Sequence, residues 1–114
     1  MKKSAIHFDV ELDEEMIPER IVWSATDSPE GANPAETKSI SLALWDQQQQ
    51  NTLRIDLWTK DMPLHEMKRF YLDCLGGMAQ SIINATGDTH MAGEIDRLCE
   101  QLMEHLRNEN TATG

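Results

Sequence analysis

Aromatic residues and long apolar runs are both scarce in this chain. Phe, Trp and Tyr together make up 5% of the 114 residues, and hydrophobic residues make up 39%. No stretch approaches the ~20 apolar residues that a membrane-spanning helix needs. Two lysines near the start resemble the n-region of a signal peptide, but His7, Asp9 and Glu11 interrupt the apolar run that should follow. We therefore expect a cytoplasmic protein with no direct membrane insertion.

Positive charge is scarce as well. Ten Lys and Arg stand against twenty Asp and Glu, which gives a formal net charge of −10. A field of this sign repels phosphate backbones and anionic lipid headgroups. The composition therefore argues against nucleic acid as a partner and leaves a basic or apolar protein partner open.

The chain has two cysteines and none of the common catalytic motifs. Cys74 and Cys99 each fall at an apolar position of a predicted helix, so we expect buried thiols, although the number alone also allows a disulfide. There is no CxxC, P-loop, G-x-S-x-G or HExxH motif. We expect no catalytic residues, no cofactor-binding residues and no metal ligands.

Two groups of side chains contain the residue types that bind metals. The acids between residues 11 and 15 lack the spaced oxygens and the glycine of a calcium loop. His90 and Glu94 have helical i,i+4 spacing, but no third ligand is apparent. A solvated acidic turn and a surface pair are the expected structures.

Four segments alternate between apolar and polar residues, which predicts four strands. They lie at 5–12, 21–25, 39–45 and 53–58. Pairing Leu12 with Ile21 places every apolar residue of the first hairpin on one face, and pairing Leu44 with Leu53 does the same for the second. The segment 26–37, with two prolines, is predicted to be a loop, and "DQQQQN" a polar turn.

From Asp61 the apolar period changes to three or four residues, which predicts two helices. Pro63 should lie in the first turn, Gly87 should end the first helix and Asp88 should cap the second. Gly76-Gly77 predicts a bend or close contact with a neighbouring backbone.

These patterns predict one α+β domain over residues 1–107 and a frayed tail over 108–114. Its architecture is a four-stranded antiparallel sheet followed by two C-terminal amphipathic helices packed on one face.

The outward face of the predicted sheet is the candidate interface. It carries small polar residues in its middle and a tryptophan at each end of the second hairpin. Tryptophan is enriched at protein interfaces, where its large ring anchors binding. We therefore select four residues as a candidate protein contact surface: Trp45, Arg54, Asp56 and Trp58. The alternative is that the tryptophans lean over the sheet edges and cover loops.

Residues 1 to about 107 resemble the gliding motility-associated GldC family of the Bacteroidetes. The resemblance rests on "ELDE", "PERIVW", Leu42–Asp46 and "TLRIDLWTKDMP" followed by "EMK". Gly76-Gly77 and "MAGEIDRLCEQLMEHL" depart from the family pattern. The resemblance implies a small non-enzymatic cytoplasmic protein linked to gliding or to secretion and envelope assembly, and it brings no catalytic residues.

The predicted order, four strands followed by two helices in a strongly acidic chain, is also similar in outline to the SecB export chaperones. That similarity concerns topology, and topology alone does not establish function. We therefore carry three hypotheses: an accessory protein that forms homo-oligomers and binds protein partners, a SecB-like holdase chaperone, and a small-ligand-binding protein or enzyme.

Overall fold

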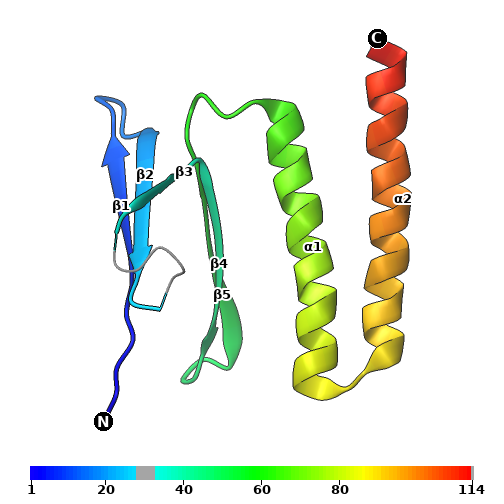
Figure 1. The fold of residues 1–114 in the computed structure, drawn as a ribbon, viewed down its shortest axis with the longest axis horizontal. Coiled ribbons are helices and arrows are strands. Elements are labelled where there is room, and N and C mark those ends of the chain that lie inside the picture. The colour runs from blue at the N-terminus through cyan, green and yellow to red at the C-terminus, as the bar shows by residue number, and fades with distance from the viewer. Residues whose placement is uncertain (28–32, 114) are drawn as a thin grey trace. The chain divides into compact units, whose positions relative to one another are not determined.

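The computed structural model describes residues 1–27 and 33–113, with side chains up to residue 109 (Figure 1). The elements follow in the order β1 (Ile6–Leu12), β2 (Pro18–Ala25), β3 (Ala35–Thr37), β4 (Ser39–Asp46), β5 (Asn51–Trp58), α1 (Leu64–Thr86) and α2 (Thr89–Thr113). The α+β class and the two C-terminal helices are confirmed. The chain divides into two compact units, Met1–Pro63 and Leu64–Gly114, which we describe separately. The predictions of a single domain and of helices packed on the sheet stay predictions.

The strands of the first unit form two antiparallel sheets, so the prediction of one four-stranded sheet is wrong. One sheet has the order β1-β2-β3, and the other pairs β4 with β5. β3 was not predicted, because it lies inside the segment 26–37 that was read as a loop; residues 28–32 of that segment lie outside the described part. The chain bends at Lys38, and this bend divides what would be one long strand between two partners.

The two hairpins differ in how well their registers were predicted. In the β4–β5 hairpin, Leu44 lies opposite Leu53, Leu42 opposite Ile55 and Ile40 opposite Leu57, as predicted. In the β1–β2 hairpin, Ile21 lies opposite Val10 instead of Leu12, so the predicted register is wrong by two residues. The apolar residues still share one face, because a shift of two preserves the alternation.

The second unit is a pair of helices joined by a short connection. Gly87 adopts a φ of 73° and donates its amide to the Ile83 carbonyl (3.0 Å), which confirms the predicted C-terminal cap. The Asp88 carboxylate accepts the Met91 amide at 2.9 Å, which confirms the predicted N-cap. Leu72, Ala79 and Ala92 are buried.

Other details of the helices differ from the predictions. α1 begins at Leu64, so Pro63 precedes the helix instead of lying in its first turn. α1 continues through Gly76 and Gly77, and a Cβ on either glycine would meet no other atom within 4 Å. Within the second unit no neighbouring backbone approaches these glycines closely, and the alternative prediction, a bend, stays a prediction. α2 extends to Thr113, so helix covers most of the predicted tail, and fraying there stays a prediction. Neither helix, over its described residues, is long and apolar enough to cross a membrane.

Candidate functional site

The β4–β5 hairpin has two faces of different character, and its register assigns each residue to one of them. The aromatic face carries eight residues: Ser39, Ser41, Ala43, Trp45, Thr52, Arg54, Asp56 and Trp58. The apolar face carries six: Ile40, Leu42, Leu44, Leu53, Ile55 and Leu57. All four predicted interface residues thus lie on the aromatic face, as the alternation required. That they bind a protein stays a prediction.

The centre of the aromatic face is a hydrogen-bonded cluster of three side chains. Arg54 donates from Nη2 to Asp56 Oδ1 at 2.9 Å and from Nε to Asp56 Oδ2 at 3.2 Å. Ser41, directly opposite Asp56 in the register, donates from Oγ to Asp56 Oδ1 at 2.8 Å and accepts from Arg54 Nη2 at 2.6 Å. The alternation in the sequence predicts that all three residues lie on this face, but it does not predict the hydrogen bonds among them.

The electrostatics of this cluster favour the charged carboxylate. The hydrogen bond from Arg54 lowers the pKa of Asp56 below its usual value, and the hydrogen bond from Ser41 lowers it further. Partial burial opposes both effects. The cluster is therefore ionised and internally paired at neutral pH. A paired, satisfied charge is far less costly to cover with another protein surface than an uncompensated one.

A tryptophan lies at each end of the aromatic face. Trp58 is opposite Ser39 at one end, and Trp45 is opposite Thr52 at the other. Trp45 is 69% exposed and Trp58 is 46% exposed. Two large exposed rings around a satisfied polar centre match the composition of a contact surface, in which aromatic anchors dominate.

The apolar face of the same hairpin is also accessible towards its turn. Leu44, Leu53 and Ile55 are each about half exposed, whereas Ile40 is buried. A hairpin of two strands with exposed large residues on both faces is marginally stable in isolation. Additional contacts are therefore expected to stabilise it.

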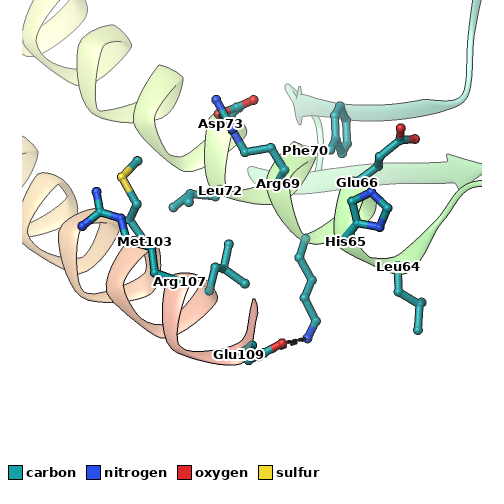
Figure 2. Close-up of a pocket in the computed structure, with 12 residues that line it drawn as sticks. Leu64, His65, Glu66, Arg69, Phe70, Leu72, Asp73, Met103, Arg107 and Glu109 are labelled. Atoms are coloured by element: carbon teal, nitrogen blue, oxygen red, sulfur yellow. Dashed lines mark hydrogen bonds and ion pairs between the residues drawn. The ribbon is translucent and has the colours of Figure 1, made fainter. Parts of the chain in front are cut away.

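A groove runs between α1 and α2 in the second unit (Figure 2). Its volume is about 1080 Å³, and its apolar lining includes Leu72, Met103 and Leu106. Four of the charged groups along it form two ion pairs: Lys68 with Glu109 at 2.8 Å and Arg69 with Asp73 at 3.1 Å. The described side chains thus place no nucleophile beside a general base here, and the groove is not the site we select.

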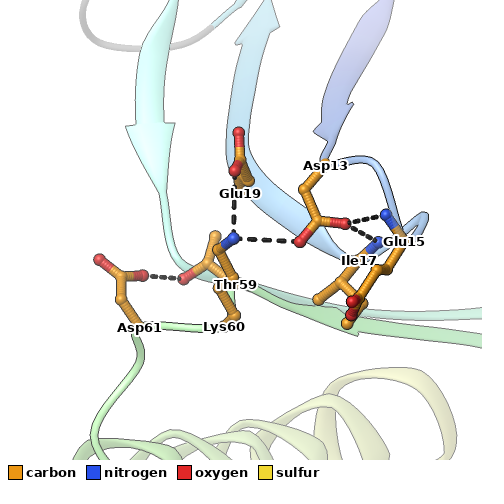
Figure 3. Close-up of polar contacts among 7 residues, drawn as sticks. All are labelled: Asp13, Glu15, Ile17, Glu19, Thr59, Lys60 and Asp61. Carbon is orange, nitrogen blue, oxygen red and sulfur yellow. Dashed lines mark hydrogen bonds and ion pairs between the residues drawn. The ribbon is translucent and has the colours of Figure 1, made fainter.

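A second polar cluster joins the two sheets of the first unit (Figure 3). Lys60, just after β5, donates from Nζ to Asp13 Oδ2 at 3.0 Å and to Glu19 Oε1 at 3.1 Å. Its backbone amide donates to the Pro18 carbonyl at 3.1 Å. These contacts fix the end of β5 against the start of β2. The sequence gives no signal for this cluster, because Lys60 lies more than 40 residues along the chain from the hairpin that carries Asp13 and Glu19.

In this cluster, Asp13 and Lys60 each stabilise the charged form of the other. The pKa of Asp13 is lowered mainly by the hydrogen bond from the Ile17 amide and next by that from Lys60. The pKa of Lys60 is raised, first by Asp13 and then by Glu19. The acidic turn that was weighed as a cation site therefore uses Asp13 to bind a lysine. Within the described residues, no group of three or more His, Cys, Asp or Glu side chains could hold a metal ion.

Comparison with known proteins gives one informative result. Searches among curated proteins and among solved structures found no match. The model of one family matches residues 18–108, which is most of the chain and includes the aromatic face, Lys60 and Glu19 but not Asp13. The chain belongs to the family described as gliding motility-associated protein GldC-like.

Proposed function

We propose that this chain is a non-enzymatic accessory protein that supports gliding motility, or the secretion and envelope machinery associated with it, through protein–protein contacts. Family membership supports the association with gliding motility. The observation that carries the contact role is the aromatic face: Trp45 and Trp58 are exposed at its two ends, and its charges are already paired. We assign the four residues Trp45, Arg54, Asp56 and Trp58 to the contact surface.

We further propose that the protein acts in the cytoplasm as a homo-oligomer. The formal charge of −10 disfavours nucleic acid and anionic membrane surfaces as partners. The exposed residues on both faces of the β4–β5 hairpin support assembly, because a two-stranded hairpin gains stability when another chain covers it.

Complementation in a gliding cell that depends on this protein tests the proposed role. The double variant Trp45→Ser, Trp58→Ser removes both rings and leaves the Arg54–Asp56 pair intact. We expect it to accumulate as a folded protein and to fail to restore spreading. The matched control is Ile83→Ser, Met91→Ser, which removes two exposed apolar side chains from the helices and should restore spreading. Full spreading with the tryptophan variant would contradict the proposal.

A SecB-like holdase is the second candidate function. It is favoured by the exposed apolar residues Leu44, Leu53 and Ile55, which could hold unfolded segments of a client. Suppression of client aggregation at an equimolar ratio tests it. Inactivity towards several chemically different clients would rule the holdase out and would leave the accessory role in place.

A further inference from the structure

The outer edge of β4 lacks the features that protect the two edges of the β1-β2-β3 sheet. Within the described residues, β4 pairs with β5 alone, over eight residues and without a register shift. β1 carries two acids and a register shift between Glu11 and Leu12, and β3 is only three residues long. Charges, irregularities and short length are the usual means of preventing edge-to-edge pairing. β4 has a single charged residue, Asp46, at its end.

The hydrogen bonds of the hairpin show which groups of β4 face this edge. The Thr59 amide donates to the Lys38 carbonyl at 2.8 Å, and these two residues lie opposite each other in the continued register. In an antiparallel pair, every second residue bonds to the partner strand. The backbone groups of the alternate residues therefore point to the outer edge: Ser39, Ser41, Ala43 and Trp45. Of these, the Ser39 carbonyl already accepts a hydrogen bond from Thr37 Oγ1 at 3.1 Å.

We propose that β4 pairs antiparallel with β4 of a second copy of this chain, with the two-fold axis at Leu42, to form a four-stranded sheet in the order β5-β4-β4-β5. This inference rests on the proposed homo-oligomer and specifies its interface. Hydrogen bonds form only if residues whose backbone groups point to the outer edge lie opposite one another. One register satisfies this condition over the greatest length of β4 and also brings the two charged ends of the strand together. It places Ser41 opposite Ala43 and Ser39 opposite Trp45 of the second copy.

Charge complementarity supports a second copy as the occupant. In this register Lys38 of each copy lies opposite Asp46 of the other, so two pairs of opposite charges flank the interface. Within its own chain Lys38 Nζ already lies 3.5 Å from Asp61 Oδ2, and Asp46 Oδ1 accepts the Gln48 and Gln49 amides, so each intermolecular pair adds to these contacts. β4 and β5 together carry two acids and one Arg, a net charge of −1 (−2 + 1), in a chain whose total is −10. The hairpin is therefore a region where two acidic copies approach each other with little repulsion.

The pairing also accounts for both faces of the hairpin. On the aromatic face, Ser39 of one copy lies between Trp58 of the same copy and Trp45 of the second copy. The strands that carry the two tryptophans are two strand spacings apart, about 9.5 Å. Both rings can then cover Ser39. On the other face, Leu42 of each copy meets its equivalent, and the apolar faces of the two hairpins become continuous.

Proline substitutions on the two edges of the hairpin test the pairing. Ala43→Pro removes a backbone amide that points to the outer edge of β4. The matched control Thr52→Pro removes a backbone amide that points to the outer edge of β5. Analytical ultracentrifugation should show a wild-type dimer whose dissociation constant rises about tenfold or more with Ala43→Pro. With Thr52→Pro it should change by less than about threefold. A monomeric wild type, or equal effects of the two substitutions, would overturn the pairing.

Cysteine cross-linking decides the register and does not require the proline variants to fold. In a chain with Cys74→Ala and Cys99→Ala, Leu42→Cys places two thiols across the axis, where Cα atoms of a non-hydrogen-bonded pair are about 4.5 Å apart. We expect mild oxidation to give a covalent dimer. Leu44→Cys is the control, because its Cα would lie more than about 12 Å from its equivalent.

Absence of the Leu42→Cys cross-link, or equal cross-linking at both positions, would overturn the inference. If the wild type is an oligomer but neither test supports β4, the oligomer forms elsewhere. The proposed role through protein contacts then stands without this interface, so the two failures are distinguishable.

Discussion

Arg54 and Asp56 form an ion pair two residues apart along β5, with Nη2 and Oδ1 separated by 2.9 Å. Ser41 of β4 contacts both side chains, so the pair also joins the two strands. The cluster holds the centre of the aromatic face in one arrangement, and the tryptophans at its ends are exposed.

The contribution of Asp56 to stability is expected to depend on pH. Its pKa is lower in the folded protein than its usual 3.8, chiefly because of Arg54 and then Ser41. The unfolded chain therefore binds the proton of Asp56 more readily than the folded protein. The stabilisation by the ionised carboxylate is fully present above the usual pKa of 3.8 and is lost as the pH falls through the lower pKa of the folded protein. The stability difference between wild type and Asp56→Asn should shrink as the pH is lowered below 3.8. Urea denaturation at each pH measures it.

The control for this pH series is Ile6→Ala, which removes no ionisable group. Its difference from wild type should stay the same over this range. A constant difference for Asp56→Asn would contradict the assigned effect of Arg54 and Ser41.

Lys60 should contribute more to stability than a helical surface ion pair. Lys60→Met removes the cation between Asp13 and Glu19 and leaves two carboxylates facing each other. Arg97→Met removes the partner of Glu94 on α2 and serves as the control. We expect a clearly larger fall in Tm for Lys60→Met by differential scanning calorimetry. Equal falls would show that the cluster does not hold the end of β5.

Shortening the side chain of Ile21 tests the packing of the first unit. Ile21 is fully buried, so Ile21→Ala should lower the free energy of unfolding by about 2–5 kcal/mol. Ile6, which is 65% exposed on the same face of the first sheet, is the control, and Ile6→Ala should cost less than about 1 kcal/mol. Chemical denaturation measures both. Similar losses would place Ile21 outside the stabilising core.

Two glycines in the helical unit should respond to alanine in opposite directions. Gly76 lies inside α1 with no atom near its Cβ position, so Gly76→Ala should stabilise by about 0.5–1 kcal/mol. Gly87 has a φ of 73°, so Gly87→Ala should destabilise by about 1–2 kcal/mol. Thermal denaturation followed by circular dichroism compares the two. The same sign for both would contradict the cap at Gly87.

The sequence predicts the β4–β5 hairpin well and the β1–β2 hairpin less well, for a physical reason. Alternation determines which face a residue occupies, but registers that differ by two residues place the same faces together. In the first hairpin, the Asp13 carboxylate accepts the Glu15 and Ile17 amides, and Met16 adopts a φ of 65°. This turn and the adjacent register shift determine the pairing, and hydrophobic alternation does not report them.

The division into two sheets has no signal in the hydrophobic pattern. Alternation predicts a loop up to Thr37 and a strand from Ser39, and it does not report that residues 35–37 pair with β2 before the chain bends at Lys38 and changes partner. The bend coincides with backbone contacts from Thr59 to Lys38 and from Lys60 to Pro18, which join segments distant in sequence. Alternation along one strand cannot report such contacts. The aromatic face was predictable because its four selected residues lie within a single hairpin.

The contact role of the aromatic face is tested most directly by quantitative affinity enrichment from gliding cells. Wild type, the Trp45→Ser, Trp58→Ser variant and the Ile83→Ser, Met91→Ser control are compared at equal expression. We predict that a defined set of proteins recovered with wild type and with the control is lost from the tryptophan variant. Equal recovery of that set with all three proteins would contradict a contact surface on the aromatic face.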